Sequence, residues 1–232
     1  AGAFAVAGAS VASNVDSSGD FAADLPRNVV LLRTSNGSNA SRLDPAVIRS
    51  VREVVGPAAE SMVYGLDVTP PTNAQLDAAW SEQQQVDDPN ELYPNVVSPN
   101  EVEIADDALL DGMGLSSTDR AALADVGAIT LWATYIGDGP SMPLAPMALP
   151  ARLVTGDGDI EFDAVGMQEP FASRNGVSGY LMTEQRASEL GIDVMPVGIR
   201  FTSADDLTAG QRRSFDEIRF GNDVFSDAWI VG

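Results

Sequence analysis

The chain has 232 residues, of which 34 are acidic and 13 are basic, so its formal net charge is −21 at pH 7, and it contains no histidine, no cysteine and no lysine. Without those three side chains the sequence excludes a Ser-His-Asp triad, a Cys-His dyad, a thiolate or imidazole zinc site and a lysine-dependent phosphate-binding loop, and its acidity argues against nucleic acids and anionic membranes as partners. The hydrophobic content of 44% supports one large folded domain or two small ones, in which carboxylates, hydroxyls and arginines are the groups left for chemistry.

The acidity itself has two explanations that the sequence does not separate. A solvated acidic surface is typical of proteins from high-salt organisms, and the missing lysine fits that origin. A coding bias toward high GC content also favours Asp and Arg over Lys.

Residues 1–26 begin with the small apolar run AGAFAVAGASVA and continue as a polar segment that is typical of a linker. The run is shorter than the roughly 20 apolar residues that span a bilayer. We interpret residues 1–26 as the stump of a membrane helix, or the remnant of a leader, followed by a linker. A short alanine-rich helix of a soluble protein is the alternative interpretation.

A strand–helix–strand unit is expected between residues 27 and 71. Residues 28–33 form an apolar run of strand length. Asp44-Pro45 is a strong helix start, and valines and Ile48 then recur at spacings of three and four up to Val55. Gly56-Pro57 predicts the helix end, and residues 61–66 predict a second strand.

Residues 72–178 are expected to form an inserted subdomain of mixed α/β structure. Helices are predicted at residues 73–85, at 106–113 and from 116 onward, and strands at 102–104 and 128–135. A hairpin is predicted from the strands 152–155 and 160–167 around Gly156-Asp157-Gly158. Prolines at several positions of 87–100 and 137–150 indicate loops.

Residues 179–232 are expected to return to the layer that the first unit begins. Residues 179–182 predict a strand, 184–190 a helix and 195–201 a second strand. Thr208 and Gln211 then have the spacing of a capping box at the start of a further helix. Residues 224–231 predict a last strand. This unit repeats the first one weakly, with chance similarity as the alternative. The matching residues are Arg33 with Arg200, Leu43 with Leu207, Arg49 with Arg213, Ser50 with Ser214, and Glu53 with Glu217.

These elements predict an α+β fold. Two βαβ-like halves, residues 27–71 and 179–232, are expected to form one layer at the two ends of the chain, with the subdomain of residues 72–178 inserted between them.

Four acidic residues alternate through the predicted hairpin and form a candidate Ca²⁺ site: Asp157, Asp159, Glu161 and Asp163. Alternate residues of a strand share one face, so their carboxylates can converge on a cation. The spacing departs from the EF-hand loop, and a solvated polar face beside a turn is the alternative that we favour. A glycosidase-like pair of carboxylates across a cleft is a further, weaker alternative. The sequence contains no pattern for a catalytic or cofactor-binding site.

An apolar, proline-rich loop is a candidate contact surface for a lipid, a hydrophobic compound or a partner protein. Its large side chains are Met142, Leu144, Met147 and Leu149. The alternative is that the loop folds back on the core. Trp80, Trp132 and Trp229 are interpreted as core or interface anchors rather than sugar-binding platforms.

Three segments carry a resemblance to a known family: VEIADDALLDGMGL at 102–115, DRAALADVG at 119–127 and GYLMTEQRASELG at 179–191. Their order resembles the extracytoplasmic domain of FtsX-like ABC-transporter permeases of the MacB type, in the style of actinobacteria, over roughly residues 27–232. The long segment 81–100 and the proline-rich loop depart from the family pattern.

The resemblance implies a porter-like layer with an inserted subdomain, a membrane helix before it, and a place on the extracytoplasmic side of the cell membrane. It also implies that ATP binds to a separate ATPase subunit, that this chain needs no cofactor, and that a second permease copy and an extracellular protein or lipid are partners. The expected role is non-catalytic: motion of the membrane helices is coupled to export of a hydrophobic or peptide substrate, or to signalling. A free-standing secreted or halophilic acidic binding protein is the alternative.

Overall fold

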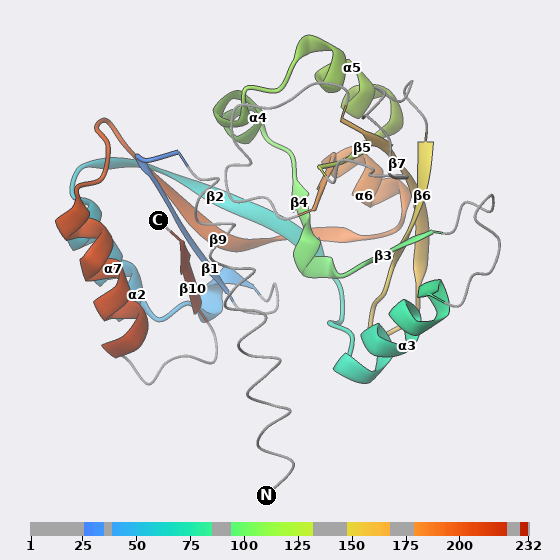
Figure 1. The fold of residues 1–232 in the computed structure, drawn as a ribbon, viewed down its shortest axis with the longest axis horizontal. Coiled ribbons are helices and arrows are strands. Elements are labelled where there is room, and N and C mark those ends of the chain that lie inside the picture. Colours follow the sequence, from blue (N-terminus) through green and yellow to red (C-terminus); the bar gives the residue numbers. More distant parts are fainter. Residues whose placement is uncertain are drawn as a thin grey trace, which may run out of the picture.

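The computed structural model describes residues 26–34, 39–84, 94–131, 148–167, 179–221 and 228–231. Two β-sheets lie side by side, each with its own helices (Figure 1), so the predicted α+β fold is confirmed. The apolar start of the chain lies outside the described residues. Within them, no helix is both long enough and apolar enough to cross a bilayer.

The first sheet has four strands in the order β10-β1-β9-β2, and every neighbouring pair is antiparallel. Its strands are β1 (Val29–Thr34), β2 (Ala58–Asp67), β9 (Asp193–Ser203) and β10 (Ala228–Val231). The helix α2 (Pro45–Val55) connects β1 to β2, and α7 (Ala209–Gly221) connects β9 to β10. Each unit therefore has two parallel strands separated by a strand of the other unit, which is the ferredoxin-like arrangement.

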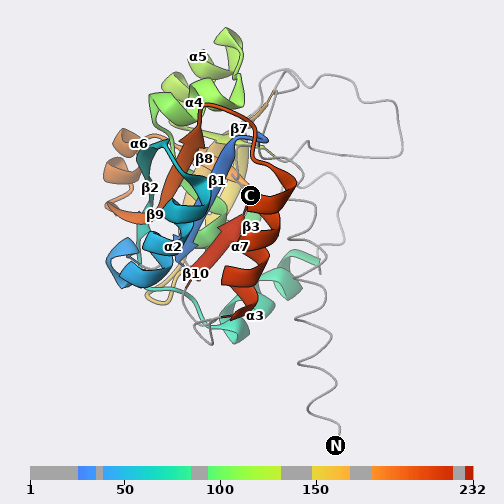
Figure 2. The ribbon, with the colours of Figure 1, turned by 90° about the vertical axis from the view of Figure 1, so that its left-hand side faces the viewer.

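Both connecting helices cover the same face of this sheet, and they lie side by side (Figure 2). Helix α2 begins where the sequence predicts, because the Asp44 carboxylate accepts a hydrogen bond of 2.7 Å from the Ala46 amide. The predicted capping box of α7 is also present: the Thr208 amide donates to Gln211 Oε1 at 2.9 Å, and the Gln211 amide donates to Thr208 Oγ1 at 3.2 Å.

The core under these helices joins residues from both ends of the chain. Val30, Leu32, Val51, Phe201 and Phe215 belong to one buried cluster. The side chain of Gln211 adds a polar link, because its Nε2 donates to the carbonyls of Val54 and Val55 at 2.9 and 3.2 Å. The first turn of α7 is thereby fastened to the last turn of α2, whose carbonyls have no partner within the helix.

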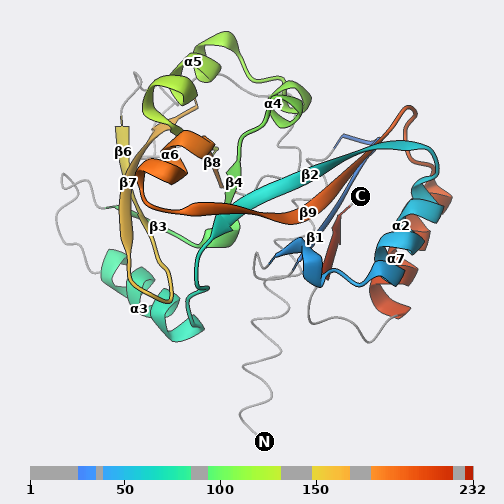
Figure 3. The same cartoon turned by 180° about the vertical axis from the view of Figure 1, so that it is seen from behind.

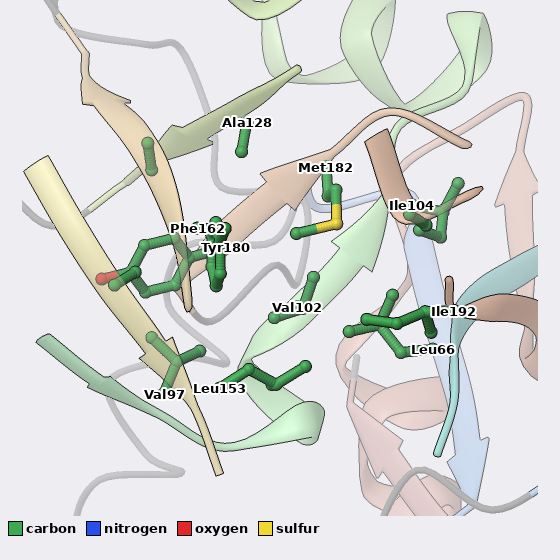
Figure 4. Close-up of a cluster of buried hydrophobic side chains, with 13 residues drawn as sticks. Leu66, Val97, Val102, Ile104, Ala128, Leu153, Phe162, Tyr180, Met182 and Ile192 are labelled. Carbon is green, nitrogen blue, oxygen red and sulfur yellow. The ribbon is translucent and has the colours of Figure 1, made fainter. Parts of the chain in front are cut away.

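The second sheet has six strands in the order β3-β6-β7-β5-β8-β4. Its strands are β3 (Asn95–Val97), β4 (Val102–Ile104), β5 (Ala128–Thr130), β6 (Ala148–Leu153), β7 (Ile160–Gly166) and β8 (Tyr180–Met182). The edge strands β3 and β4 follow one another in the chain, joined by Ser98 and the short 3₁₀ helix η3 (Pro99–Glu101). The sheet therefore curls, and its concave face encloses a cluster that includes Phe162, Tyr180 and Met182 (Figure 4).

Helices cover the outside of this curled sheet (Figure 3). They are α3 (Asn73–Gln84), α4 (Asp107–Met113) and α5 (Ser117–Val126). The short helix α6 (Glu184–Glu189) packs on the enclosed core instead, because its Ala187 belongs to the cluster of Phe162, Tyr180 and Met182. A further 3₁₀ helix, η2 (Ala40–Arg42), precedes α2 in the first unit. Leu109, Met113 and Leu123 of α4 and α5 pack with Ile129 and Leu181 from the convex face of the sheet. Alternate strand residues thus point into two separate cores, as the two-residue period of a strand requires.

The structure differs from the sequence-based boundaries at two places. The strand β8 pairs with β4 and β5, and α6 follows it, so residues 180–189 lie with the six-stranded sheet rather than with the terminal layer. The strand β6 begins at Ala148, inside the segment predicted as a loop. Both differences arise from long-range strand pairing, which local sequence patterns do not report.

A two-stranded ribbon connects the two sheets. The strands β2 and β9 pair continuously from Ala58 with Ser203 to Asp67 with Asp193, with a register irregularity at Val63/Tyr64. One end of the ribbon belongs to the four-stranded sheet, and Leu66 at the other end packs in the core of the curled sheet. The ribbon is therefore the continuous backbone link between the two parts (Figure 3).

Candidate functional site

A buried charged cluster lies where the two sheets meet. It begins with Glu103 in the middle of β4, between Val102 and Ile104, whose side chains point into the core of the curled sheet (Figure 4). Because strand residues alternate, the Glu103 side chain points to the opposite side, toward the four-stranded sheet. The carboxylate is only 2% exposed.

Two arginines from the four-stranded sheet meet this carboxylate. Arg200 of β9 donates from Nη2 to Glu103 Oε1 at 2.7 Å, and Arg33 of β1 donates from Nη1 to Oε2 at 3.4 Å. The strand register places Arg200 opposite Leu31 and Arg33 opposite Gly198. Both arginines therefore lie on the face of the sheet away from α2 and α7, since their neighbours Leu32 and Phe201 pack under those helices.

The weak sequence repeat acquires a structural meaning here. Arg33 belongs to the first strand of the first βαβ unit, and Arg200 belongs to the first strand of the second unit. The two strands are neighbours, so the repeated arginines approach one carboxylate that the inserted part supplies. All three parts of the predicted organisation thus contribute one charged side chain to the same cluster.

The electrostatics of the cluster are unbalanced. Burial raises the pKa of Glu103, while the nearby Arg33 and Arg200 guanidinium groups oppose that rise and the Asp106 carboxylate adds to it. Two guanidinium groups face one buried carboxylate, and within the described part of the chain the Nε and Nη1 groups of Arg200 have no hydrogen-bond partner. Buried donors without partners are costly, so this cluster carries an energetic penalty as well as an attraction.

A second acidic group, Glu101, is half-buried in η3 between the edge strands β3 and β4. The Glu101 carboxylate accepts a hydrogen bond of 2.7 Å from the Ser98 amide, and burial raises the pKa of Glu101 despite that bond. Burial also raises the pKa of Tyr180, whose hydroxyl is hydrogen-bonded to the Thr130 and Asn95 side chains. Glu101 and Glu103 thus both have a raised pKa, but one caps η3 and the other is held by arginines, so neither is positioned as a free acid or base.

The four residues of the calcium hypothesis are all exposed in the β6–β7 hairpin. Asp157 lies in the turn, Asp159 pairs with Arg152 at 3.4 Å, and Glu161 and Asp163 point outward from β7. Arg152 also binds Glu82 of α3 at 3.0 Å. Among the described residues, no group of three or more acidic side chains is arranged to hold a metal ion. The hairpin itself is confirmed, with Ala151 opposite Phe162.

The apolar contact loop falls mostly outside the described residues, which include none of Met142, Leu144 and Met147. Leu149 is described, lies in β6 and is 5% exposed, so for this residue the contact-surface prediction is wrong and the alternative, packing on the core, is confirmed. Trp80 is 41% exposed on α3, so it is not a core anchor, and its role as an interface anchor stays a prediction. Trp132 and the side chain of Trp229 lie outside what the structure describes.

Sequence reasoning missed Glu103, although a signal was present. A single acidic residue stands between two β-branched residues in a strand that reads as buried on both faces. Such a carboxylate requires a cationic partner, and arginine is the only side chain in this composition that can supply one. Which of the 13 basic residues fills that role depends on the pairing of strands far apart in the chain.

Comparisons with protein-family models, with curated proteins and with solved structures find no match to this chain.

Proposed function

We propose that this chain is the non-catalytic extracytoplasmic domain of an ABC-transporter permease subunit. In this role it couples ATP-driven motion of membrane helices to export of a hydrophobic or peptide substrate, or to signalling to an extracellular partner. The ATP-binding subunit, a second permease copy, and an extracellular protein or lipid are its proposed partners. The proposal rests on the sequence resemblance and on how the fold is organised.

The observation that supports it most directly is the position of the first and last described strands. Leu31 of β1 pairs with Val231 of β10 in an antiparallel register, so the start of β1 lies beside the end of β10. Segments that precede β1 and follow β10 therefore leave the same end of the same sheet. A domain held between two membrane helices needs that arrangement, because both helices return to one bilayer.

The connection between the two sheets suits a mechanical role. A displacement applied to β1 and β10 acts directly on the four-stranded sheet, because both strands are paired within it. The β2–β9 ribbon continues from that sheet into the curled one, and the buried Glu103 cluster joins them side by side. Movement at the base of the domain is thereby passed to the inserted part through paired strands rather than through a flexible linker.

The test uses the gene in its native context. The full-length protein should sediment with membranes, and its domain should be accessible to protease only from the extracytoplasmic side. Recovery of the native protein free of membranes would contradict the proposal and support the alternative of a free-standing acidic binding protein. Turnover of a small substrate by the purified chain would contradict the non-catalytic role.

Motion can be measured in the same membranes, because the chain has no cysteine of its own. Spin labels at Glu53→Cys of α2 and Asp163→Cys of β7 report on the distance between the two parts. Labels at Glu53→Cys and Glu217→Cys, both on helices of the four-stranded sheet, provide the matched control. ATP added with the ATPase subunit should change the first distance and leave the second unchanged; no change in either would contradict mechanical coupling.

A further inference from the structure

The pairing between β2 and β9 is interrupted where the four-stranded sheet ends. The strand β1 pairs with β9 as far as Gly198, and beyond that residue β9 pairs with β2 alone. Val63 lies opposite Gly198. The next residue of β2, Tyr64, lies opposite Pro196, so Val197 is an extra residue on β9. An extra residue bends a strand, and a proline has no amide hydrogen to donate to the ladder. The ribbon is therefore weakest at the boundary between the two parts.

The ribbon is partly open to solvent on one side of this interruption. Tyr64 is 39% exposed, and Pro196 opposite it is half-buried. Tyr64 shares a face of β2 with Met62, which lies opposite Ile199 and therefore faces the side of α2 and α7. The Glu103 cluster lies on the other face, where β4 lies against β2. A bend of the ribbon toward the helix side therefore draws β4 away from the four-stranded sheet.

The charged contact that β4 makes with this sheet is incomplete. Arg200 is 3% exposed and donates from Nη2 to Glu103 at 2.7 Å, whereas its Nε and Nη1 groups are buried without a partner among the described residues. Arg33 reaches the same carboxylate at 3.4 Å. Buried donors without partners lose their hydration and gain nothing in exchange. Separation of the two sheets returns water to both guanidinium groups, so the closed contact depends on a small difference between attraction and lost hydration.

We propose that the Glu103 cluster is a latch and that the interrupted stretch of the ribbon, at Tyr64 and Pro196, is its hinge. In the closed state, described above, the two parts move as one body. In the open state the ribbon is bent, Arg33 and Arg200 are hydrated, and the face of the four-stranded sheet that β4 covers meets solvent. The helix-covered core and the core of the curled sheet stay intact in both states, because each lies on one side of the hinge. The inference does not depend on the proposed transport role, since it concerns an equilibrium of the chain alone.

Thiol labelling tests the latch, because the chain has no cysteine of its own. Leu31 and Leu32 are consecutive residues of β1 and are buried on opposite faces: Leu31 lies opposite Arg200 on the latch side, and Leu32 packs under the helices. Leu31→Cys should react with dithiodipyridine, an uncharged thiol reagent, through opening of the latch, at a rate that low urea concentrations change little. Leu32→Cys is the matched control. It should react only through global unfolding, so its rate should rise steeply with urea.

Glu103→Gln weakens the latch, so it should raise the labelling rate of Leu31→Cys several-fold more than that of Leu32→Cys. If the buried cysteines prevent folding, spin labels at the exposed positions Glu53→Cys and Asp163→Cys decide the matter in the purified chain, without membranes or ATP. Glu103→Gln should broaden that distance distribution and leave the distribution between Glu53→Cys and Glu217→Cys unchanged. The same urea dependence in both cysteine variants, the same rise in both with Glu103→Gln, or an unchanged distance distribution would each overturn the proposal.

Discussion

The two sheets of this molecule differ in how their strands are specified. The four-stranded sheet contains β2 and β9, with 10 and 11 residues, whereas four strands of the six-stranded sheet have only 3 residues each. The first sheet is covered on one face by two capped helices. The second curls around its own core and receives Leu66 and Ile192 from the connecting segments. Long strands with local helices are stable as a unit, whereas very short strands depend on what surrounds them.

This difference shows that each part of the molecule depends on the other to complete its buried interior. The curled sheet cannot complete its core without the end of the β2–β9 ribbon, and the four-stranded sheet cannot bury Arg200 without Glu103 from β4. Each part thus supplies a buried group to the other. We therefore expect the two parts to unfold together, and the following experiments test that expectation from the largest effect to the smallest.

Breaking the charged cluster should have the largest effect. Arg200→Met leaves Glu103 buried with only the longer contact to Arg33, and removing one partner of a buried ion pair costs about 3–5 kcal/mol of unfolding free energy. The double variant Arg200→Met/Glu103→Leu removes the closer ion pair and leaves only Arg33, which is 13% exposed, so it should recover part of that loss. Urea unfolding measures both. A double variant as unstable as the single one would show that the charges are not what joins the two sheets.

Two large-to-small substitutions, one in each core, test whether the two sheets unfold together. Phe201→Ala in the helix-covered core should cost about 3–5 kcal/mol, and Leu153→Ala in the curled core about 2–5 kcal/mol. In both variants, amide hydrogen exchange should lose protection in both sheets by the same free energy. Met62→Ala, at a position 38% exposed on β2, is the control and should change stability little. Loss of protection confined to one sheet would show independent unfolding.

A pair of glycine substitutions tests the close packing of the four-stranded sheet. A Cβ atom at Gly198 would lie 2.6 Å from the carbonyl oxygen of Leu32, which is main chain and cannot move aside, so Gly198→Ala should cost about 1–3 kcal/mol. Gly210 of α7 has only one neighbour, at 3.8 Å, and Gly210→Ala should stabilise the helix by about 0.4–1 kcal/mol. Thermal unfolding compares them. Equal effects of the two substitutions would contradict the packing described for β1 and β9.

The pH dependence of the unfolding free energy should show the smallest difference between the two parts. Burial raises the pKa of Glu101 in the curled part, so between the ordinary glutamate value and the raised value the unfolded chain has lost a proton that the folded protein keeps. The unfolding free energy therefore falls as pH rises through that window, and Glu101→Gln should remove the share of this fall that Glu101 contributes, while Glu103, whose pKa burial also raises, keeps its own share. Unfolding in urea at a series of pH values measures the profile.

Glu60 of β2 supplies the control of opposite sign. The hydrogen bonds from Arg52 lower the pKa of Glu60, so its contribution is present above the ordinary glutamate value and is lost as pH falls toward the lowered one. Glu60→Gln should remove that low-pH loss, by a small amount because the pair is largely exposed. An unchanged profile in Glu101→Gln would contradict the burial of that carboxyl.

Much of the fold was predictable because its signals are local. The N-cap of Asp44, the capping box of Thr208 and Gln211, and the hairpin around Gly156-Asp157-Gly158 all depend on residues within a few positions of each other. The candidate site was less predictable. The four alternating acidic residues are close in the sequence, so their pattern is visible there. Glu103 and Arg200 are 97 positions apart in the sequence, and no local sequence pattern links them.

The amino-acid sequence by itself determined the fold class, the capped starts of α2 and α7, and a chemistry limited to carboxylates, hydroxyls and arginines. The tertiary structure alone decided which short strands form the curled sheet, that residues 180–189 belong to it, and that one acidic residue of the insertion meets the repeated arginines. The reason is physical: helix caps and turns are satisfied by neighbours along the chain, whereas a strand of 3 residues and a buried charge are satisfied only by groups that the completed fold brings to them.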